Sequence, residues 1–288
     1  MKPNPLADPP DLSSLREVRA LLDRHGLRPD KGFGQNFLVD RSALHAIVEA
    51  AHLPPNATVL EVGPGLGVLT AALAERSGRV ISLELDRRVL PALEETTGAW
   101  PHVEVLHQDA VQFDHLAMPE GSYFVSNLPY QVATAILADA LASRRYVRLV
   151  VLVQREVAER IIARPGDSAF GAYSLLIEHY GEARIVRDVA AGCFHPPPNV
   201  TSSIVRIDVR PDAEPDEALF TLIRAGFQHR RKTLRKNLVG HGYSASAVDA
   251  GLAALGVDPR IRAEVLTLQQ WRTLKDHLYT VGEAPGGS

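Results

Sequence analysis

The sequence predicts an α/β fold followed by a small all-α domain. Short β-branched apolar runs alternate with helical stretches from residue 58 to residue 162, the pattern of a mostly parallel sheet covered on both faces. After Asp212 the pattern changes to helices alone. The chain has 288 residues, of which 45% are hydrophobic, so it is long and apolar enough to bury a core.

An arm and two helices precede the first strand. Residues 1–30 combine a proline-rich arm with a helix over 14–25, in which apolar residues recur at helical spacing and which Gly26 ends. A glycine-rich stretch follows. Asp40 is a candidate N-cap for a second helix that runs to about Ala51.

Seven strands are expected after these helices. They span residues 58–62, 80–85, 103–106, 123–126, 147–153, 184–189 and 203–209. The intervening helices end near residues 76, 96, 141 and 162. Acidic residues and prolines at 212–216 form a predicted linker, and the final helices span 217–229, 232–239, 245–255 and 268–278. The expected division is therefore an N-terminal arm and helix at 1–30, an α/β domain at 31–211 and a helical domain at 212–288.

Composition excludes several classes of protein. Cys193 is the single cysteine, so no intramolecular disulfide forms, and no Cys/His cluster has zinc-ligand spacing; we expect a cytoplasmic protein without a metal. No apolar run approaches the roughly 20 residues that span a bilayer, so no membrane association is expected. The net charge of −3 argues against general coating of nucleic acid, but it permits one basic face.

Three successive strand ends carry groups suited to an adenosine-type ligand. The first strand runs into a turn in which Gly63 and Gly65 let the backbone approach a ligand; Val68 stands where the pyrophosphate-binding pattern requires glycine, which disfavours NAD. Glu84 ends the second strand and can accept hydrogen bonds from both hydroxyls of a ribose. Asp109 follows the third strand and can accept an adenine amino group. Each has an alternative when taken singly: the glycines fit a tight turn, Glu84 fits a solvated carboxylate and Asp109 fits a helix cap. Together they indicate an adenosine-type pocket.

The tetrapeptide Asn127-Leu128-Pro129-Tyr130 follows the fourth strand. An adenine amino group is a poor nucleophile, and two acceptors aimed at its N–H bonds would draw its lone pair out of conjugation. The Asn127 side-chain oxygen and the Leu128 carbonyl are such acceptors, and Pro129 stiffens the turn between them. Tyr130 offers an aromatic face to an extruded base. The alternative is an ordinary turn between strand and helix.

These residues resemble, in order, the motifs of the ribosomal RNA adenine N6-dimethyltransferases. The motifs are Gly34-Gln-Asn-Phe-Leu38, Glu61-Val-Gly-Pro-Gly-Leu-Gly67, Glu84-Leu-Asp86, Gln108-Asp-Ala110, Asn127-Leu-Pro-Tyr130 and Phe194-His-Pro-Pro-Pro-Asn-Val200. The resemblance covers about residues 31–278 and is strongest to the branch acting on 16S rRNA, whose loss gives kasugamycin resistance. The glutamine N5-methyltransferases carry Asn-Pro-Pro-Tyr instead, and Leu128 separates this chain from them.

The resemblance implies a Rossmann-like, seven-stranded, S-adenosylmethionine-dependent methyltransferase domain at 31–211. By similarity, Asn36 and Leu38 close over the methionine part of the cofactor, and Gly63, with Gly65, lines its back. Glu84 then holds the ribose, Asp109 meets the cofactor adenine, and Asn127 contacts both cofactor and target base. Tyr130 and Phe194 sandwich the target ring; the alternative for Phe194 is an ordinary core residue.

A basic cluster in the helical domain is a candidate RNA-binding surface. It consists of Arg224, Arg230, Arg231, Lys232, Arg235 and Lys236, with no acidic residue among residues 224–236. Such a cluster would neutralise phosphates, and its alternative is a solvated helix face. The expected partner is 16S rRNA within the 30S particle, bound by a monomer through this one patch.

Two adjacent adenines near the 3′ end of 16S rRNA are the expected targets, converted to N6,N6-dimethyladenosine during small-subunit biogenesis. Two alternatives remain open at this point. One is an antibiotic-resistance methyltransferase acting on a single adenine of 23S rRNA, whose motif usually reads Asn-Ile-Pro-Tyr. The other is a ribosome-assembly factor that binds RNA without catalysis.

Overall fold

A computed structural model describes residues 12–30, 32 and 34–280. Within them the chain divides into two compact units. The first contains residues up to Ala158 together with Glu182–Pro211, and the second contains Glu159–Gly181 and the residues from Asp212 onward. None of the described helices is long and apolar enough to cross a membrane.

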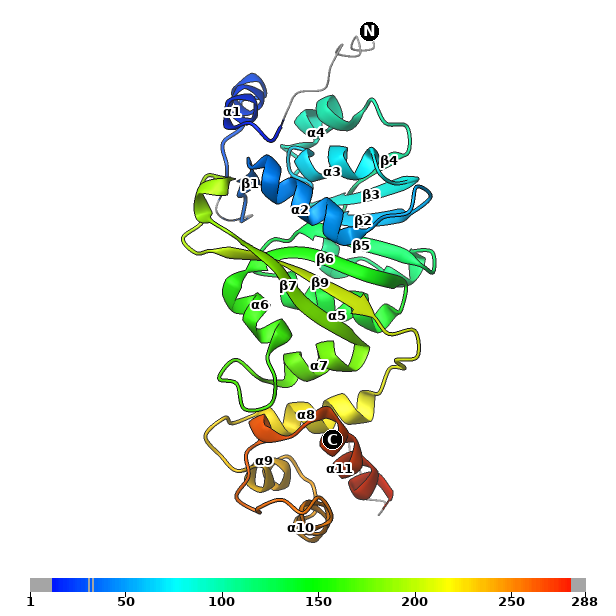
Figure 1. The fold of residues 1–288 in the computed structure, drawn as a ribbon, viewed down its shortest axis with the longest axis vertical. Helices are drawn as coiled ribbons and strands as arrows, with labels where there is room; N and C mark the ends of the chain where they lie inside the picture. Colours follow the sequence, from blue (N-terminus) through cyan, green and yellow to red (C-terminus); the bar gives the residue numbers. More distant parts are fainter. Residues whose placement is uncertain (1–11, 31, 33, 281–288) are drawn as a thin grey trace. The chain divides into compact units, whose positions relative to one another are not determined.

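A seven-stranded sheet forms the first unit (Figure 1). Its strands are β2 (Thr58–Val62), β3 (Arg79–Glu84), β4 (Val103–His107), β5 (Ser122–Asn127), β6 (Tyr146–Gln154), β7 (Gly181–Val189) and β9 (Ser202–Val209), in the order β4-β3-β2-β5-β6-β9-β7. The five strands from β4 to β6 are parallel, and β9 pairs with β6 in the antiparallel sense. All seven predicted strands are confirmed, and so is the mostly parallel sheet.

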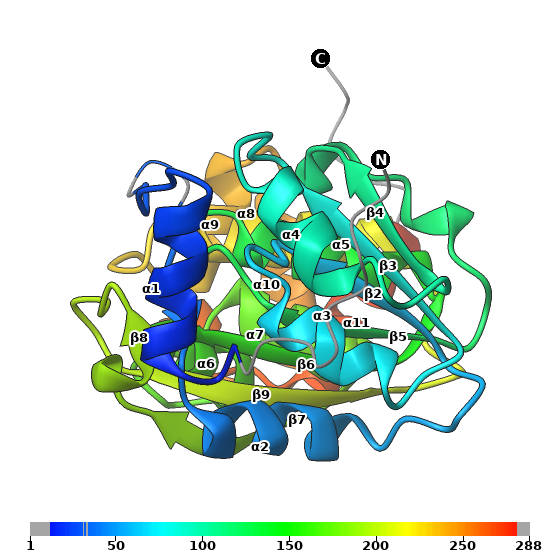
Figure 2. The same cartoon turned by 90° about the horizontal axis from the view of Figure 1, so that it is seen from above.

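The parallel strands are apolar because helices cover them. Leu149 to Val153 of β6 are all fully buried, as expected for a central strand without a solvent face. Helix α2 (Arg41–Ala51) begins at Asp40, whose side chain accepts the Ala43 N–H at 2.7 Å, so the predicted N-cap is confirmed. Its buried face packs on this sheet, mainly against β6 and also against β5 and β9, and Figure 2 shows it running along β9.

Helices follow the carboxyl ends of β2, β3, β5 and β6. They are α3 (Val68–Ala74), α4 (Leu90–Thr97), α5 (Ala133–Ser143) and α6 (Arg155–Ile162), while two short 3-10 turns, at Ala110–Gln112 and His115–Ala117, join β4 to β5. Because parallel strands end at the same edge of a sheet, these connections gather the strand ends that carry the predicted motifs.

The N-terminal part of the first unit holds a pairing that the sequence did not predict. Helix α1 (Leu15–Arg24) is followed by the two-residue strand β1 (Phe37–Leu38), which pairs in the antiparallel sense with β8 (Phe194–His195). Phe37 lies opposite His195, and Leu38 lies opposite Phe194. This pairing holds residues 37–38 beside the segment that precedes the three prolines.

The second unit is helical and contains more of the chain than the sequence indicated. Its helices are α7 (Ala172–Tyr180), α8 (Glu217–Phe227), α9 (Leu234–Gly240), α10 (Ala245–Ala254) and α11 (Leu268–Thr280). Helix α7 was not predicted, and residues 159–181 were placed in the α/β domain. They belong to the second unit because their aromatic rings pack there: Tyr180 stacks on Phe220 with centroids 6.0 Å apart, and Phe170 meets Phe227 edge-on at 6.3 Å.

Candidate functional site

A cavity in the first unit opens at the carboxyl ends of β2, β3 and β5. It is lined by the segments 34–38, 61–66, 83–85, 108–110 and 127–132, together with Val68, Leu69 and Ile136. Each of these segments contains residues that the sequence had marked. The cavity therefore collects motifs far apart in the chain, at the place where open α/β sheets bind ligands.

The glycine turn after β2 needs glycine at each of its three positions. Gly63, Gly65 and Gly67 have φ values of 67°, 58° and 84°, in the left-handed region that L side chains rarely adopt. A Cβ atom at Gly67 would lie 2.7 Å from Thr96 Oγ1, and one at Gly65 would lie 3.0 Å from Phe37 Cε1. The turn thus packs against its neighbours and presents backbone to the cavity.

Glu84 lies at the end of β3 with its carboxylate held in place. Its Oε2 accepts the Gly65 N–H at 3.1 Å, its Oε1 accepts the Asp86 N–H at 2.8 Å, and the residue is 7% exposed. Burial raises the pKa of this carboxyl, and the backbone N–H bonds oppose that shift. The side chain lines the cavity with acceptors already oriented, as a ribose-binding carboxylate requires.

Glu61 also lines the cavity, and the sequence analysis gave it no role. It lies in β2, is 1% exposed, and its Oε2 accepts the hydroxyls of Thr70 and Ser82 at 2.7 and 2.8 Å. Burial raises the pKa of Glu61 to about 7, against the effect of these hydrogen bonds. A charged residue in an otherwise apolar strand was the signal that could have found it.

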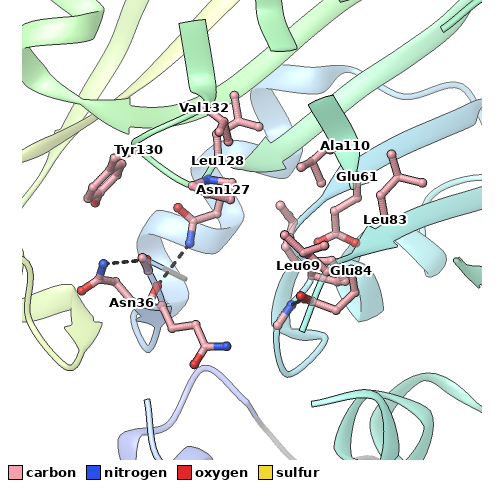
Figure 3. A pocket seen from close by; sticks show the side chains of 18 of the residues that line it. Asn36, Glu61, Leu69, Leu83, Glu84, Ala110, Asn127, Leu128, Tyr130 and Val132 are labelled. Carbon is pink, nitrogen blue, oxygen red and sulfur yellow. Dashed lines mark hydrogen bonds between the residues drawn. The ribbon is translucent and has the colours of Figure 1, made fainter. Parts of the chain in front are cut away.

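The Asn127–Tyr130 corner faces this cavity (Figure 3). Asn127 Nδ2 donates to the Asn36 carbonyl at 3.4 Å, and the Leu128 N–H donates to the Leu152 carbonyl at 3.2 Å. Within the described part of the chain, no group donates to Asn127 Oδ1 or to the Leu128 carbonyl. Both proposed acceptors are thus available to a ligand.

Tyr130 and Pro129 define the two sides of this corner. Pro129 Cγ lies 3.4 Å from where a Cβ of Gly63 would be, so the corner and the glycine turn are in close contact. The Tyr130 hydroxyl forms a hydrogen bond with Ser202 Oγ at 2.8 Å, which fixes the ring, and burial raises its pKa. In Figure 3, Asn127 lies between Tyr130 and Glu84.

Of the other predicted site residues, three line the cavity and Phe194 does not. Asn36, Leu38 and Asp109 line the cavity, and Asp109 Oδ1 also caps the following turn by accepting the Val111 N–H at 2.9 Å. A carboxylate has a second oxygen, so the cap and a ligand contact are compatible. Phe194 is 4% exposed, packs in the apolar cluster that contains Leu38, and is not among the cavity-lining residues.

The basic cluster lies in the second unit, and its members differ in how they are bound. Arg224, Arg230, Arg231, Lys232 and Lys236 are exposed, whereas Arg235 is partly buried. Arg235 donates to both carboxylate oxygens of Asp249 at 2.5 and 2.8 Å, and Arg230 donates to the Ser168 carbonyl at 2.7 Å. The cluster is therefore a surface of mostly solvated cations.

Comparison with known proteins decides the family. A model of the ribosomal RNA adenine dimethylase family matches residues 27–278. The chain belongs to this family. It is an S-adenosylmethionine-dependent rRNA adenine dimethyltransferase, and the predicted family, activity and cofactor are confirmed.

Relatives of the ribosomal RNA adenine dimethylase family align over nearly the full chain. Ribosomal RNA small subunit methyltransferase A of Deinococcus radiodurans is 45% identical over 285 residues, covering 95% of this chain and 97% of the relative. The protein of that name from Shouchella clausii is 36% identical, covering 94% and 96%.

Solved structures give the same fold. A dimethyladenosine transferase from Plasmodium falciparum superimposes with a TM-score of 0.76 at 23% identity, covering 86% of this chain and 99% of that one. The 23S rRNA methyltransferase ErmE has a TM-score of 0.67 at 29% identity, covering 85% and 100%. These matches confirm the Rossmann-like methyltransferase domain followed by helices.

Proposed function

We propose that this chain transfers methyl groups to N6 of two adjacent adenines near the 3′ end of 16S rRNA, in the 30S particle, during small-subunit biogenesis. Its relatives at 45% and 36% identity bear the name of a small-subunit rRNA methyltransferase. The observation that carries the proposal is that the Asn127–Tyr130 corner and the glycine turn line one cavity. Methyl donor and acceptor can therefore meet there.

The cofactor occupies the half of the cavity formed by the glycine turn and the ends of β3 and β4. Glu84 accepts the ribose hydroxyls, Asp109 accepts the adenine amino group, and the backbone at Gly63 and Gly65 lies against the cofactor. Asn36 and Leu38 enclose the methionine part. When bound, S-adenosylmethionine supplies an electrophilic methyl group on a positively charged sulfur.

The target adenine occupies the half formed by the corner. Asn127 Oδ1 and the Leu128 carbonyl accept its two N6–H bonds, which localises the nitrogen lone pair, and Pro129 holds the two acceptors in register. Tyr130 stacks on the base. Because the two acceptors orient the amine toward the methyl group, proximity and orientation supply most of the acceleration.

Phe194 is proposed as the second aromatic wall. Its ring is buried at 4% exposure, so it can stack on a base only if the segment around β8 shifts when RNA binds. Binding of the RNA backbone is assigned to the exposed cations Arg224, Arg230, Arg231, Lys232 and Lys236, with Arg235 contributing less because Asp249 pairs with it. We also propose that the protein acts as a cytoplasmic monomer.

The alternative substrate is an adenine of 23S rRNA. The likeness to ErmE, a 23S rRNA methyltransferase, supports this alternative. The support is weaker than for 16S rRNA, because the identity to ErmE is 29% and the identity to the small-subunit relative is 45%. Mass spectrometry of rRNA from cells lacking this protein distinguishes the two. Loss of two adjacent dimethyladenosines from 16S rRNA is the expected result, and loss of a 23S modification with intact 16S rRNA would contradict the proposal.

A further inference from the structure

Asp86 links two of the segments that line the cavity, 34–38 and 83–85, although no role has been given to it above. It follows β3 by two residues and is 4% exposed. Its backbone N–H donates to Glu84 Oε1 at 2.8 Å, and its carboxylate accepts Gln35 Nε2 at 2.8 Å. One residue therefore holds both the proposed ribose carboxylate and the 34–38 segment.

Arg88 fixes the Asp86 carboxylate from the other side. Its Nε and one terminal nitrogen donate to the two Asp86 oxygens at 2.8 Å each, a bidentate pair. Arg88 holds the pKa of Asp86 below its usual range. The same terminal nitrogen also donates to the Asp30 carboxylate at 3.0 Å, so Arg88 bridges the β3–α4 loop and the N-terminal segment.

Gln35 is the point at which these bonds close into a ring. Its Oε1 accepts the Asp30 backbone N–H at 2.9 Å while its Nε2 donates to Asp86, so both ends of the amide are engaged. Its own N–H donates to the Asp30 carbonyl at 3.2 Å. The side chain and backbone of Gln35 are thus fixed together.

Asn36 follows Gln35 in the chain, so fixing the Gln35 backbone also restricts the position of Asn36. Its carbonyl accepts Asn127 Nδ2 at 3.4 Å, and its side chain donates to the Gly34 carbonyl at 3.0 Å. Hydrogen bonds therefore run from Glu84 through Asp86 and Gln35, and on by way of Asn36 to Asn127. The two halves of the cavity are joined by one network.

We propose that Asp86, held by Arg88, is a positioning residue that locks the 34–38 segment over the cofactor through Gln35 and so sets the affinity for S-adenosylmethionine. The inference rests on the assignment of this cavity to the cofactor. Asp86 acts at one remove: it orients Glu84 through its backbone and Gln35 through its carboxylate. Unlocking the segment weakens cofactor binding before it impairs folding, because Arg88 and Asp30 lie at the surface.

Reversing the Asp86–Gln35 hydrogen bond tests the lock. Gln35→Glu alone sets two carboxylates against each other, and Asp86→Asn alone weakens the pair with Arg88. In the double variant, the new amide at position 86 donates to the new carboxylate at position 35, so the bond returns in the opposite direction. The same Asp86 oxygen accepts from Gln35 and from Arg88, so the double variant recovers the bond to position 35 but not the pair with Arg88. Titration calorimetry of S-adenosylmethionine into the full chain, without RNA, should show Kd raised about tenfold by Gln35→Glu and lowered in the double variant to about the Kd of Asp86→Asn alone.

A matched control separates geometry from charge. Gln112→Glu makes the same chemical change at an exposed residue of the first unit that does not line the cavity. S-adenosylmethionine carries a net positive charge, so an added carboxylate attracts it, and Gln112→Glu should leave Kd unchanged or slightly lower. Amide hydrogen exchange at residues 34–38 should be faster in Gln35→Glu than in the wild type, and in the double variant it should slow to about the rate of Asp86→Asn alone.

Two results would overturn the inference. One is a wild-type Kd in Gln35→Glu; the other is a double variant whose Kd is raised by the product of the two single effects. If Gln35→Glu does not fold, Arg88→Met, at a side chain that is 51% exposed, must raise Kd severalfold for the inference to stand. Because no RNA is present, this experiment and the mapping of the methylated nucleotide succeed or fail separately.

Discussion

The cavity and the basic cluster are both rich in charge, but they are built in opposite ways. Glu61 and Glu84, which line the cavity, and Asp86, which is bonded to Glu84 beside it, are 1–7% exposed, and each accepts hydrogen bonds from the protein itself. In the second unit, Arg231, Lys232 and Lys236 are exposed. The difference teaches that geometry is set in advance at the proposed site of methyl transfer, whereas the proposed RNA-binding surface relies on solvated cations whose attraction salt screens.

Removing the proposed acceptor at the corner should have the largest effect. Asn127→Ala leaves one N6–H of the target without its partner, and kcat should fall about 10²- to 10³-fold, measured by transfer of labelled methyl to immature 30S particles. Particle binding should stay near wild type. Asn56→Ala, at an exposed turn, is the control and should be fully active. A fall in binding as large as the fall in kcat would make Asn127 a structural residue.

Removing the aromatic face of the corner should act on RNA affinity. Tyr130→Ala loses a stacking surface worth about 1–3 kcal/mol, so KM for the particle should rise at least about fivefold. Tyr130→Phe keeps the ring and loses only the hydrogen bond to Ser202, so its KM should be close to wild type. If both variants bind equally poorly, the hydroxyl rather than the ring is what matters.

Alanine substitution of the exposed cations should weaken RNA binding more than substitution of Arg235, which is paired with Asp249. Alanine at Arg231, Lys232 or Lys236 should each lower affinity for 16S rRNA severalfold and reduce the slope of log K against log salt by about 0.7–0.9. Arg235→Ala should have a smaller effect on both, because Asp249 already satisfies that guanidinium. Filter binding over a salt series measures these slopes. If the slope of log K against log salt is the same for all variants and the wild type, the cluster does not contact RNA phosphates and is only a solvated helix face.

The buried carboxylate of β2 should affect stability rather than rate. The folded chain raises the pKa of Glu61 from 4.5 to about 7, so it binds more protons than the unfolded chain between these values. The free energy of unfolding therefore falls as pH rises through this window, by at most about 3 kcal/mol from this group.

Glu61→Gln should abolish this part of the pH dependence. The hydroxyls of Thr70 and Ser82 can still form hydrogen bonds with the new amide, so the variant should fold. Because an amide does not titrate, the free energy of unfolding of the variant, measured with urea, should fall less than that of the wild type between about pH 5 and about pH 8. Glu120→Gln, at a side chain 83% exposed, is the control and should follow the wild type. A variant with an unchanged slope would place the titration elsewhere.

Much of the architecture could be predicted because its signals are local. All seven strands of the sheet, the Asp40 cap and the helices after residue 217 follow from runs of apolar residues and caps within a few positions of each other. Helix α7 lacked such a signal, and its place in the second unit depends on ring packing by Phe170 and Tyr180 against α8. Phe194 was named for its neighbours in sequence, yet the structure buries its ring.

The sequence by itself determined the order and chemical types of the motifs, and hence the family and the reaction, because each motif is a short run of residues that can be recognised without the fold. Tertiary structure decided which charged groups are buried, which are paired and which face a cavity. Glu61, Asp86 and Arg235 look alike as single charges in the sequence. Their roles differ because solvation depends on strands and loops that are distant in the chain and meet only in the folded protein.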